Sequence, residues 1–545
     1  MQDTANHKES QVKTNLEYWT DRIAKELMAE RSSGRGIIVN DSKTPSGRIH
    51  VGSLRGTVIH DAVFKSLVQG GADGVRFLYG FDDMDPLDSL PIYLDRERFE
   101  KFMGHPFCNI PSPEAGFENF AKFFASEFIE VFENLGCHPE IYWMSDVYRS
   151  GRMNDVIRMS LENAAKVREI YERISGTVKP GDWLPFQPVC ENCGRIGTTR
   201  AYDFDGETVA YTCEPAMVEW AKGCGHSGRR SPFNGGGKLP WKLEWAGRWP
   251  VLGVSFECAG KDHFTKTGSR AVSEEISRSV YGYAPPEGFG YEFFLIGGKK
   301  MSSSKGRGVS AKEISGMVPP QILRFLLMKT RPTAQLDFDP GGPTLPRLFD
   351  EFDRYERMYF GLEEIPSGQA VNVSRIYELC QLGQVPKEAP KRVPFSHAAV
   401  LVQFFADDVK VLEQLEKSGH IDSASGAPET VVERIRFARS WTNTHAAPEM
   451  LTRILEALPD PSSFSDSEKK VFSSLAELFS AKTNPGEDEV MQTLRDAAGT
   501  AGLEVRDAFG AVYRLFLGKP AGPRLGVFLP ALERDFTVKR LKLEK

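Results

Sequence analysis

The amino-acid sequence predicts an α/β protein with a parallel-sheet domain, a cysteine-rich insertion in that domain, and an all-helical C-terminal half. Three observations lead to this prediction. Short apolar runs alternate with helical patterns in the first half of the chain, as in parallel sheets covered on both faces. Four cysteines are spaced like metal ligands. Beyond about residue 345, helical periodicity dominates, and short breaks rich in Pro, Ser and Asp separate the helices.

The first strand–helix–strand unit spans residues 36–80. Residues 36–40 form a short β-branched apolar run, which is typical of a buried parallel strand. Apolar residues four apart then predict a helix that ends at Gly70-Gly71, and residues 75–80 are the next strand. Ligands of such units bind at the carboxyl ends of the strands. We therefore expect a site in the turn that follows the first strand.

This turn and the helix start carry residues suited to phosphate, in the run Thr44-Pro45-Ser46-Gly47-Arg48-Ile49-His50-Val51-Gly52-Ser53. A helix that begins here is expected to offer free backbone N–H groups to a phosphate. Gly52 removes a side chain where a flat base could approach, and His50 can donate a hydrogen bond to a phosphate oxygen. A histidine alone is more often structural. The presence of both His50 and the lysine segment described next favours a phosphate-binding role for this turn.

A second phosphate-type segment lies about 250 residues further on. It follows the apolar, strand-like run 293–298 and reads Lys299-Lys300-Met301-Ser302-Ser303-Ser304-Lys305-Gly306. Glycines and serines predict a loop, and three lysines bring positive charge to its tip. Such a loop suits a polyphosphate that must be held while charge shifts onto its leaving group. The alternative is a surface loop with incidental lysines.

Acidic and aromatic residues follow the next strands. Asp82, Asp83 and Asp85 come at the end of a buried strand and could hold a substrate ammonium group; the alternative is helix capping or solvated loop charge. Three tryptophans four apart predict a helical core stripe or a pocket wall, where a tryptophan could receive an aliphatic chain that ends in a cation. The run 251–257 predicts another strand. Asp262 and His263 follow it and could bind ribose hydroxyls or substrate.

The cysteine cluster predicts a structural metal site. Its spacing is C-x2-C-x19-C-x10-C, and its members are Cys190, Cys193, Cys213 and Cys224. Four thiolates close a tetrahedral zinc site, which leaves no open position for catalysis. The sequence between the cysteines is polar, so metal would supply much of its folding energy. The alternative is a set of cysteines without metal.

Composition narrows the class of protein. The chain has 545 residues, 41% hydrophobic and 26% charged, with a net charge of −6. A net acidic chain is not a general nucleic-acid coat, so RNA contacts would need a local basic face. The N-terminus has no signal-peptide core, and no apolar run reaches membrane-spanning length. We expect a cytoplasmic protein without a membrane partner; its oligomeric state is open, with a monomer favoured.

The order of these motifs resembles the class I type of lysyl-tRNA synthetase. The first turn is similar to the His-x-Gly-His signature of class I aminoacyl-tRNA synthetases, and the lysine segment to their Lys-Met-Ser-Lys-Ser loop. Further motifs resemble those of the lysine-specific type. They are Thr-Pro-Ser-Gly, Asp-Asp-Met-Asp-Pro, the cysteine cluster, Gly-Lys-Leu-x-Trp-Lys-x-x-Trp, Gly-Lys-Asp-His and Tyr-Glu. The resemblance covers residues 16–345 and returns at 517–519 and 522–526.

The resemblance implies a Rossmann-like parallel-sheet catalytic domain with a zinc-binding insertion, followed by an all-helical anticodon-binding domain. The expected boundaries are 16–172 for the first half of the catalytic domain with a helical connective segment, 173–245 for the zinc-binding insertion, 246–298 for the second half, 299–345 for the lysine loop and stem-contact region, and 346–545 for the helical domain.

The resemblance also implies a site and a reaction. The implied activity is ATP-dependent activation of lysine to lysyl-adenylate and transfer to the 3'-terminal ribose of tRNA(Lys), with Mg²⁺ accompanying ATP. The expected catalytic residues are His50, Gly52, Ser53, Lys300, Ser303 and Lys305. The expected ATP-binding residues are Pro45, Ser46, Gly47, His50, Gly52, Asp262, Lys300 and Met301. The expected lysine-binding residues are Thr44, Asp82, Asp83, Trp241, His263 and Tyr291.

Three departures from the family pattern bear on this interpretation. Ser53 stands where the first signature has its second histidine, Ser303 stands where the loop signature has its second lysine, and Ser42 stands where we expect a glycine two residues before Thr44. Ser53 can still hydrogen-bond a ribose or phosphate, and Lys305 could supply the missing charge. Two alternatives stay open: a class I synthetase for another amino acid, with glutamate nearest, and a non-catalytic zinc-containing RNA-binding protein.

Overall fold

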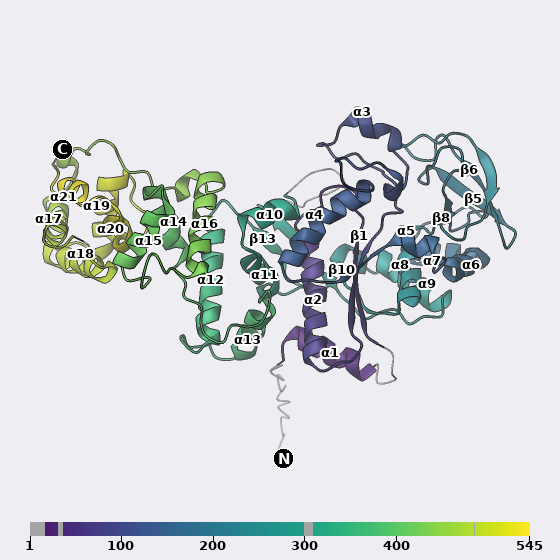
Figure 1. Cartoon of the computed structure of the whole chain (residues 1–545), viewed down its shortest axis with the longest axis horizontal. Coiled ribbons are helices and arrows are strands. Elements are labelled where there is room, and N and C mark those ends of the chain that lie inside the picture. The colour runs from purple at the N-terminus through teal and green to yellow at the C-terminus, as the bar shows by residue number, and fades with distance from the viewer. Residues whose placement is uncertain (1–16, 31–35, 299–308, 484, 545) are drawn as a thin grey trace, which may run out of the picture. The chain divides into compact units, whose positions relative to one another are not determined.

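The computed structural model describes residues 17–30, 36–298, 309–483 and 485–544 (Figure 1). The chain divides into two compact units, which are described separately. The first comprises residues up to Gly316 together with Pro320–Phe338 and Glu364–Val385. The second comprises Met317–Pro319, Asp339–Glu363 and Pro386–Lys545.

The first unit is built on a four-stranded sheet in the order β3-β2-β1-β9, in which every neighbouring pair is parallel. The strands are β1 (Ile38–Lys43), β2 (Arg76–Phe81), β3 (Glu140–Trp143) and β9 (Val254–Phe256). Helix α2 (Ser53–Gln69) connects β1 to β2. The predicted strand–helix–strand unit is therefore confirmed, and its carboxyl-terminal edge bears the candidate site.

In the described residues of the first unit, twelve further helices and short helical turns surround this sheet. They are α1 (Trp19–Glu30), α3 (Arg96–Phe99), η1 (Glu100–Phe102), η2 (Phe107–Asn109), α4 (Phe120–Asn134), α5 (Met144–Arg149), α6 (Asn154–Glu162), α7 (Ala164–Ser175), α8 (Trp241–Leu252), η3 (Lys261–Phe264), α9 (Ser269–Ser279) and α10 (Ala311–Met317). Two more belong to its later segments, α11 (Pro320–Lys329) and α13 (Ala370–Leu379).

Short strands complete the first unit. The cysteine-rich insertion forms a three-stranded antiparallel sheet of β5 (Thr199–Phe204), β6 (Val209–Cys213) and β7 (Ser227–Arg230), and an antiparallel pair of β4 (Gln187–Pro188) and β8 (Gly237–Lys238). Two parallel pairs are β10 (Ala259–Gly260) with β11 (Gly290–Tyr291), and β12 (Phe294–Ile296) with β13 (Leu336–Phe338). Strand β12 leads directly into the lysine segment.

The structure differs from two local predictions. The run 251–257 was expected to be all strand, but Val251 and Leu252 still belong to α8, which continues past Pro250. Strand β9 begins only at Val254, after Gly253 ends the helix in a left-handed conformation with φ +74°. Strand β3 lies in the connective segment, which was expected to consist of helices. Its four residues are too few to interrupt the surrounding helical pattern.

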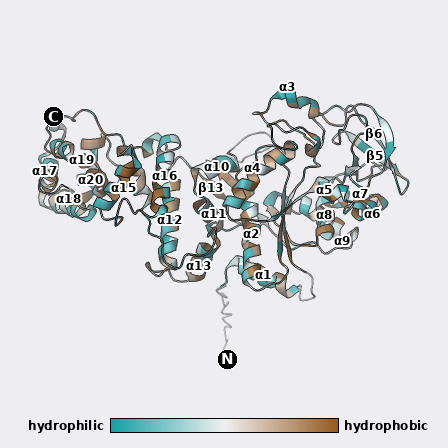
Figure 2. Cartoon of the chain, viewed as in Figure 1, coloured by the Kyte–Doolittle hydropathy of each residue, from teal (hydrophilic) through white to brown (hydrophobic). Residues whose placement is uncertain are grey.

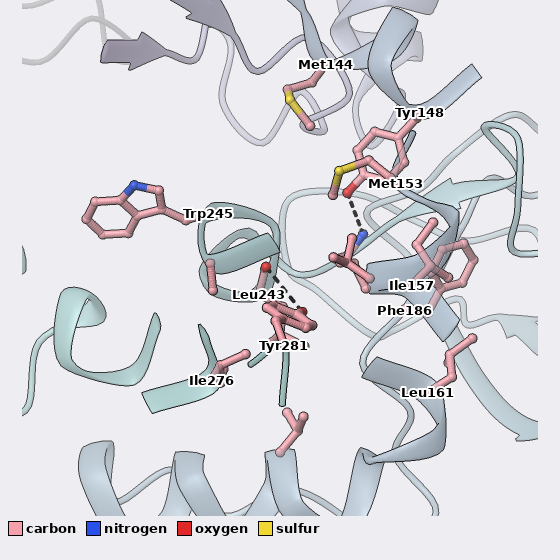
Figure 3. Close-up of a cluster of buried hydrophobic side chains, with 14 of the residues drawn as sticks. Met144, Tyr148, Met153, Ile157, Leu161, Phe186, Leu243, Trp245, Ile276 and Tyr281 are labelled. Carbon is pink, nitrogen blue, oxygen red and sulfur yellow. Dashed lines mark hydrogen bonds between the residues drawn. The ribbon is translucent and has the colours of Figure 1, made fainter. Parts of the chain in front are cut away.

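A hydrophobic core fixes the connective helices against α8 and α9. Figure 3 shows Tyr148, Phe186, Leu243 and Tyr281 among the buried side chains of this cluster. The Tyr148 hydroxyl accepts a hydrogen bond from the Leu239 N–H at 3.0 Å and donates one to Glu244 Oε2 at 2.7 Å. This core therefore sets the positions of β8 and α8, which both contribute to the candidate site.

The second unit confirms the predicted all-helical C-terminal half, because all secondary structure described beyond Phe338 is helical. Figure 2 shows helices there with hydrophobic residues toward one side and hydrophilic residues toward the other. The elements are α12 (Thr344–Tyr359), α14 (Phe395–Phe404), α15 (Asp408–Lys417), α16 (Glu429–Thr444), η4 (Pro448–Met450), η5 (Pro461–Ser463), α17 (Asp466–Ala481), α18 (Glu487–Ala501), α19 (Val505–Leu517), α20 (Leu525–Ala531) and α21 (Arg534–Leu541).

None of the helices in the described part of the chain combines the length and the apolar character that crossing a membrane requires.

Candidate active site

A cavity of about 630 Å³ opens at the carboxyl ends of β1 and β2. Seven predicted site residues line it: Thr44, Ser46, Ser53, Asp82, Trp241, His263 and Tyr291. Its charged lining consists of six acids and three cations, namely Asp41, Asp82, Asp85, Asp88, Glu244, Glu257, Lys43, Lys238 and Arg248. The excess of acids makes the cavity attractive to a cationic ligand.

The far flank of the lysine segment is attached to the His50 turn. The Val51 N–H donates to the Val309 carbonyl at 3.2 Å, and the Ala311 N–H donates to the Ile49 carbonyl at 2.9 Å. His50 and Ser310 face each other in this antiparallel bridge. Two stretches about 250 residues apart in sequence thus meet. The predicted site residues Lys300, Met301, Ser303 and Lys305 lie outside the described residues.

Arg55, on α2, holds the near flank of the same segment. Its side chain is 1% exposed. One terminal nitrogen donates to the carbonyls of Glu292 and Phe293 at 2.9 and 3.3 Å, and the other donates to those of Arg331 and Ala334 at 2.8 and 2.7 Å. Because β12 starts at Phe294 and pairs with β13, Arg55 ties α2 to the strand pair that leads into the lysine segment.

The backbone at the start of α2 corrects one expectation. We expected free N–H groups there, but the N–H groups of Ser53 and Leu54 donate to the carbonyls of His50 and Val51, both at 3.0 Å. The Arg55 N–H donates to Gly52 at 3.3 Å. The tight turn that brings residues 49–51 against residues 309–311 consumes these donors. Within the described chain, the Gly52 N–H has no hydrogen-bond partner.

The acids after β2 point in different directions. Asp82 pairs with Arg248, and Asp85 pairs with Lys238 and accepts a hydrogen bond from the Thr44 hydroxyl at 2.9 Å. Both line the cavity. Asp83 is fully buried and accepts from the Ser145 N–H at 2.8 Å at the start of α5. Asp83 therefore caps a helix and does not reach the cavity, in contrast to the expectation that it contacts substrate.

Glu244 completes a buried network of charges. Its carboxylate lies 3.3 Å from Lys238 Nζ and 3.6 Å from Arg248 Nη2. Burial raises the pKa of Glu244 to about 7, and the two cations oppose this shift. Burial by itself lowers the pKa of Lys238, but Asp85 and Glu244 raise it more, so the net shift is upward. The two cations offset the free-energy cost of burying these carboxylates together.

Asp41, at the end of β1, has no lysine or arginine within ion-pair distance in the described chain. Burial raises its pKa to about 8; the charge of Glu257 adds to the shift, while Ser42, Lys43 and Thr57 oppose it. Gly56 on α2 makes room for this group. A Cβ there would lie 2.7 Å from the Tyr291 hydroxyl and 3.2 Å from Asp41 Oδ2.

His60 is a structural histidine beside Asp41. Its Nδ1 lies 2.7 Å from the Gly56 carbonyl, to which it donates, and its Nε2 accepts from the Cys258 N–H at 2.8 Å. Burial lowers the pKa of His60 to about 4, so the ring stays neutral. The histidine therefore joins α2 to the segment after β9 and takes no proton from the cavity.

An aromatic group forms another wall of the cavity. The His263 ring lies 5.8 Å from Trp241 and 5.7 Å from Trp245, edge to face, and the two indoles stack at 6.2 Å. His263 Nδ1 lies 2.7 Å from the Ser269 hydroxyl, which fixes the ring. Trp241 is 46% exposed, whereas Trp249 is fully buried. Both tryptophan predictions are thus confirmed, one for a pocket wall and one for a core stripe.

Several expected nucleotide-binding residues do not line this cavity. Pro45 and Gly47 are buried within the turn, and Asp262 is exposed on η3. His50 and Gly52 lie in the turn next to Ser53, which does line it.

Lys238, Glu244 and Arg248 line the cavity but were not predicted from the sequence. A sequence signal was present for Glu244 and Arg248. Trp241, Glu244, Trp245 and Arg248 are spaced i, i+3, i+4 and i+7, so one face of a helix carries aromatic and charged residues together. Charges on the buried face of a helix usually mark a paired network.

The four cysteines of the insertion converge. Their sulfurs all lie within 4.8 Å of one another, with Cys190–Cys224 and Cys193–Cys213 both at 3.7 Å. Zn–S bonds of about 2.3 Å at tetrahedral angles place sulfurs about 3.8 Å apart, so the residues fit zinc. His226 is not in the cluster. Gly194 and Gly225 adopt φ +74° and +79°, so each allows a tight turn directly after a cysteine of the cluster.

Known proteins are similar to this chain over nearly its full length. A "Lysine--tRNA ligase" of Picrophilus torridus is 31% identical over 525 residues, which are 96% of this chain and 98% of the relative. A protein of the same name from Methanocaldococcus jannaschii is 32% identical over 546 residues, covering 96% and 99%. A solved glutamate tRNA ligase from Elizabethkingia meningosepticum matches at 11% identity with a TM-score of 0.39, covering 93% and 98%, a likeness too weak to bear on the fold.

A family model also matches the chain. The model describes tRNA synthetases class I (K) and matches residues 17–383, a range that includes the sheet, the cavity, the cysteine cluster and the lysine segment. The chain therefore belongs to the class I (K) tRNA synthetases.

Proposed function

We propose that the protein is a lysine–tRNA ligase that activates lysine with ATP and transfers it to tRNA(Lys). The observation that carries this proposal is the cavity itself, in which six acids outnumber three cations beside an aromatic wall. A free lysine brings two ammonium groups, one carboxylate and an aliphatic stem. The names of the full-length relatives support the same substrate.

In this proposal, lysine lies between the end of β1 and the aromatic wall. Thr44, Trp241, His263 and Tyr291 contact it, and Asp82 contributes charge. We add Asp41, because it is an acid of the cavity without a cation partner in the described chain. Asp41 lies beside the Tyr291 hydroxyl, so an ammonium group bound there could donate hydrogen bonds to both oxygens. We assign no substrate contact to Asp83.

Activation requires no protein nucleophile. The lysine carboxylate attacks the α-phosphate of ATP, and pyrophosphate leaves; the terminal ribose hydroxyl of tRNA then attacks the resulting anhydride. The work of the protein is to position the reactants and to neutralise developing negative charge. We assign phosphate and ribose contacts to Ser46, His50, Ser53 and the Gly52 N–H, and charge neutralisation to Lys300 with Lys305. Mg²⁺ bound to ATP would neutralise further phosphate charge.

The decisive test is pyrophosphate exchange across the twenty amino acids, with and without tRNA. Exchange that depends on lysine supports the proposal, and exchange with another amino acid overturns it. Glutamate is the nearest alternative, but a glutamate site should present a free arginine. Arg248 lines this cavity and is already paired with Asp82. ATP binding without exchange under either condition would instead favour a non-catalytic RNA-binding protein.

Lysine binding should strengthen as the pH rises toward 8.5. The raised pKa of Asp41, about 8, means that its carboxyl is mostly protonated at pH 7 in the free enzyme. An ammonium group binds the ionised form, so KM for lysine should fall by about eightfold between pH 7 and 8.5 if one proton is linked to binding. Exchange kinetics at several pH values would measure this. Asp41→Asn should raise KM and flatten the profile; an unchanged slope in this variant would contradict the role of Asp41.

We also propose that the cysteine cluster binds a structural zinc ion. Removing it should unfold the insertion, since structural zinc supplies roughly 10 kcal/mol or more in small zinc domains. The loss should reach the cavity through β8, because β8 carries Lys238, which pairs with Asp85. Cys193→Ser is therefore expected to lose zinc and to lower lysine-dependent exchange. Cys108→Ser, outside the cluster, is the control and should retain both metal and activity.

A further inference from the structure

A second group of potential metal ligands lies in the all-helical unit, far in sequence from the cysteine cluster. It consists of His397 on α14, His420 just after α15, and Glu487 at the first position of α18 (Figure 1). One ligand atom from each residue lies within 4.8 Å of the other two. Residues from three separate segments thus converge on one point within this unit.

The two histidines are arranged to offer free ring nitrogens. His420 Nδ1 lies 2.9 Å from the Ser418 hydroxyl, whose own proton is within reach of the carbonyls of Gln414 at 2.8 Å and Leu415 at 3.2 Å. A hydroxyl that donates to either carbonyl accepts from His420, which places the imidazole proton on Nδ1 and leaves the lone pair on Nε2. A hydrogen bond of this kind typically fixes the tautomer of a metal-binding histidine.

His397 supplies a second, independent observation. The residue is only 7% exposed, and among the described residues its imidazole makes no hydrogen bond. Its ring packs edge to face on His420, with centroids 4.2 Å apart. No protein group of the described chain occupies its ring nitrogens, so a cation can bind there.

We propose that His397, His420 and Glu487 form a second zinc site, which joins α14, the end of α15 and the start of α18. Two imidazoles and one carboxylate are a donor set that Zn²⁺ accepts, with water in the fourth position. Tetrahedral bonds of about 2.1 Å place donors about 3.4 Å apart, so a small side-chain closure from the observed separation completes the site. Bound zinc stabilises the helical unit by linking segments distant in sequence.

Arg524 is the group that competes with this ion. Its Nη1 lies 3.8 Å from Glu487 Oε1, but its side chain is 77% exposed. An exposed, weak ion pair contributes little free energy, so the guanidinium can move into solvent when the metal binds. Arg524→Gln should therefore bind zinc at least as tightly as the wild type.

The test uses the full chain with any affinity tag removed and the cysteine site already filled with zinc. Isothermal titration with further Zn²⁺ should show one additional equivalent of bound zinc. His420→Ala and Glu487→Gln should each weaken the affinity for this equivalent by at least about 10-fold, the smallest loss common for disturbed metal sites. Ser418→Ala should weaken it as well, because the tautomer is no longer fixed. His138→Ala, at an exposed histidine of the first unit, should leave it unchanged.

Two outcomes overturn the proposal: the absence of a second equivalent in the wild type, or its retention in both His420→Ala and Glu487→Gln. If His420→Ala does not fold, Glu487→Gln and Ser418→Ala decide the question, since neither empties a buried position. Cobalt gives a separate check. An equivalent bound by nitrogen and oxygen adds visible absorption without the sulfur charge-transfer band of the cysteine site.

Discussion

Replacing Lys300 by Ala should lower the rate of lysine-dependent pyrophosphate exchange by about 100- to 1000-fold, the usual cost of losing one preorganised group that stabilises transition-state charge. The reason is that Lys300 is assigned to the pyrophosphate as its negative charge develops. Lysine affinity should change little, because the lysine cavity is built from other segments. Exchange kinetics at saturating ATP and varied lysine separate the two effects.

Two neighbouring lysines serve as matched comparisons for this prediction. Lys299→Ala should stay close to the wild type, whereas Lys305→Ala should be impaired if Lys305 replaces the lysine missing at Ser303. The thermal midpoint should be the same in all three variants. A Lys300→Ala rate within a few-fold of the wild type would refute the assigned role of the lysine segment.

Asp82→Asn should destabilise the protein by about 3 kcal/mol and raise KM for lysine. The change removes the ion-pair partner of Arg248, whose side chain is 3% exposed, and breaking a buried pair on one side costs about 3–5 kcal/mol. Arg248 would keep only Glu244, at 3.6 Å. Two of its other nitrogens are buried without a hydrogen-bond partner in the described chain, so no further acceptor compensates. Urea unfolding and exchange kinetics measure the two effects.

Asp88→Asn is the control for Asp82→Asn. Asp88 also lines the cavity but is exposed, so its loss should leave the unfolding midpoint nearly unchanged. The double variant Asp82→Asn/Arg248→Met should recover part of the lost stability without recovering lysine affinity. Equal midpoints for the wild type and Asp82→Asn would mean that the pair contributes no stability.

Features with a local signal in the sequence were predicted correctly. The strand–helix–strand unit around α2 follows from periodicity, and the converging cysteines follow from their spacing. Features that depend on side-chain direction or on pairing between distant residues were not predicted. Asp82 and Asp85 lie three apart in a turn and face the cavity, whereas Asp83 between them points to Ser145. Nothing in the sequence distinguishes these acids without knowledge of the turn.

Contacts between residues far apart in the chain were also not predictable from the sequence. Lys238 meets Asp85 across 153 residues of chain, and no local pattern joins them. The N–H groups expected to be free at the start of α2 donate to carbonyls of the preceding turn, which is itself hydrogen-bonded to residues 309–311. The expected domain boundaries and site roles stay predictions.

The sulfur geometry of the insertion has a consequence for handling the protein in air. Two cysteine pairs already stand at 3.7 Å, Cys190 with Cys224 and Cys193 with Cys213. Once a chelator withdraws the ion, dissolved oxygen can oxidise each pair to a disulfide with little movement of the chain. The protein would then keep a cross-linked insertion that no longer accepts zinc, so a reductant must accompany every attempt at reconstitution.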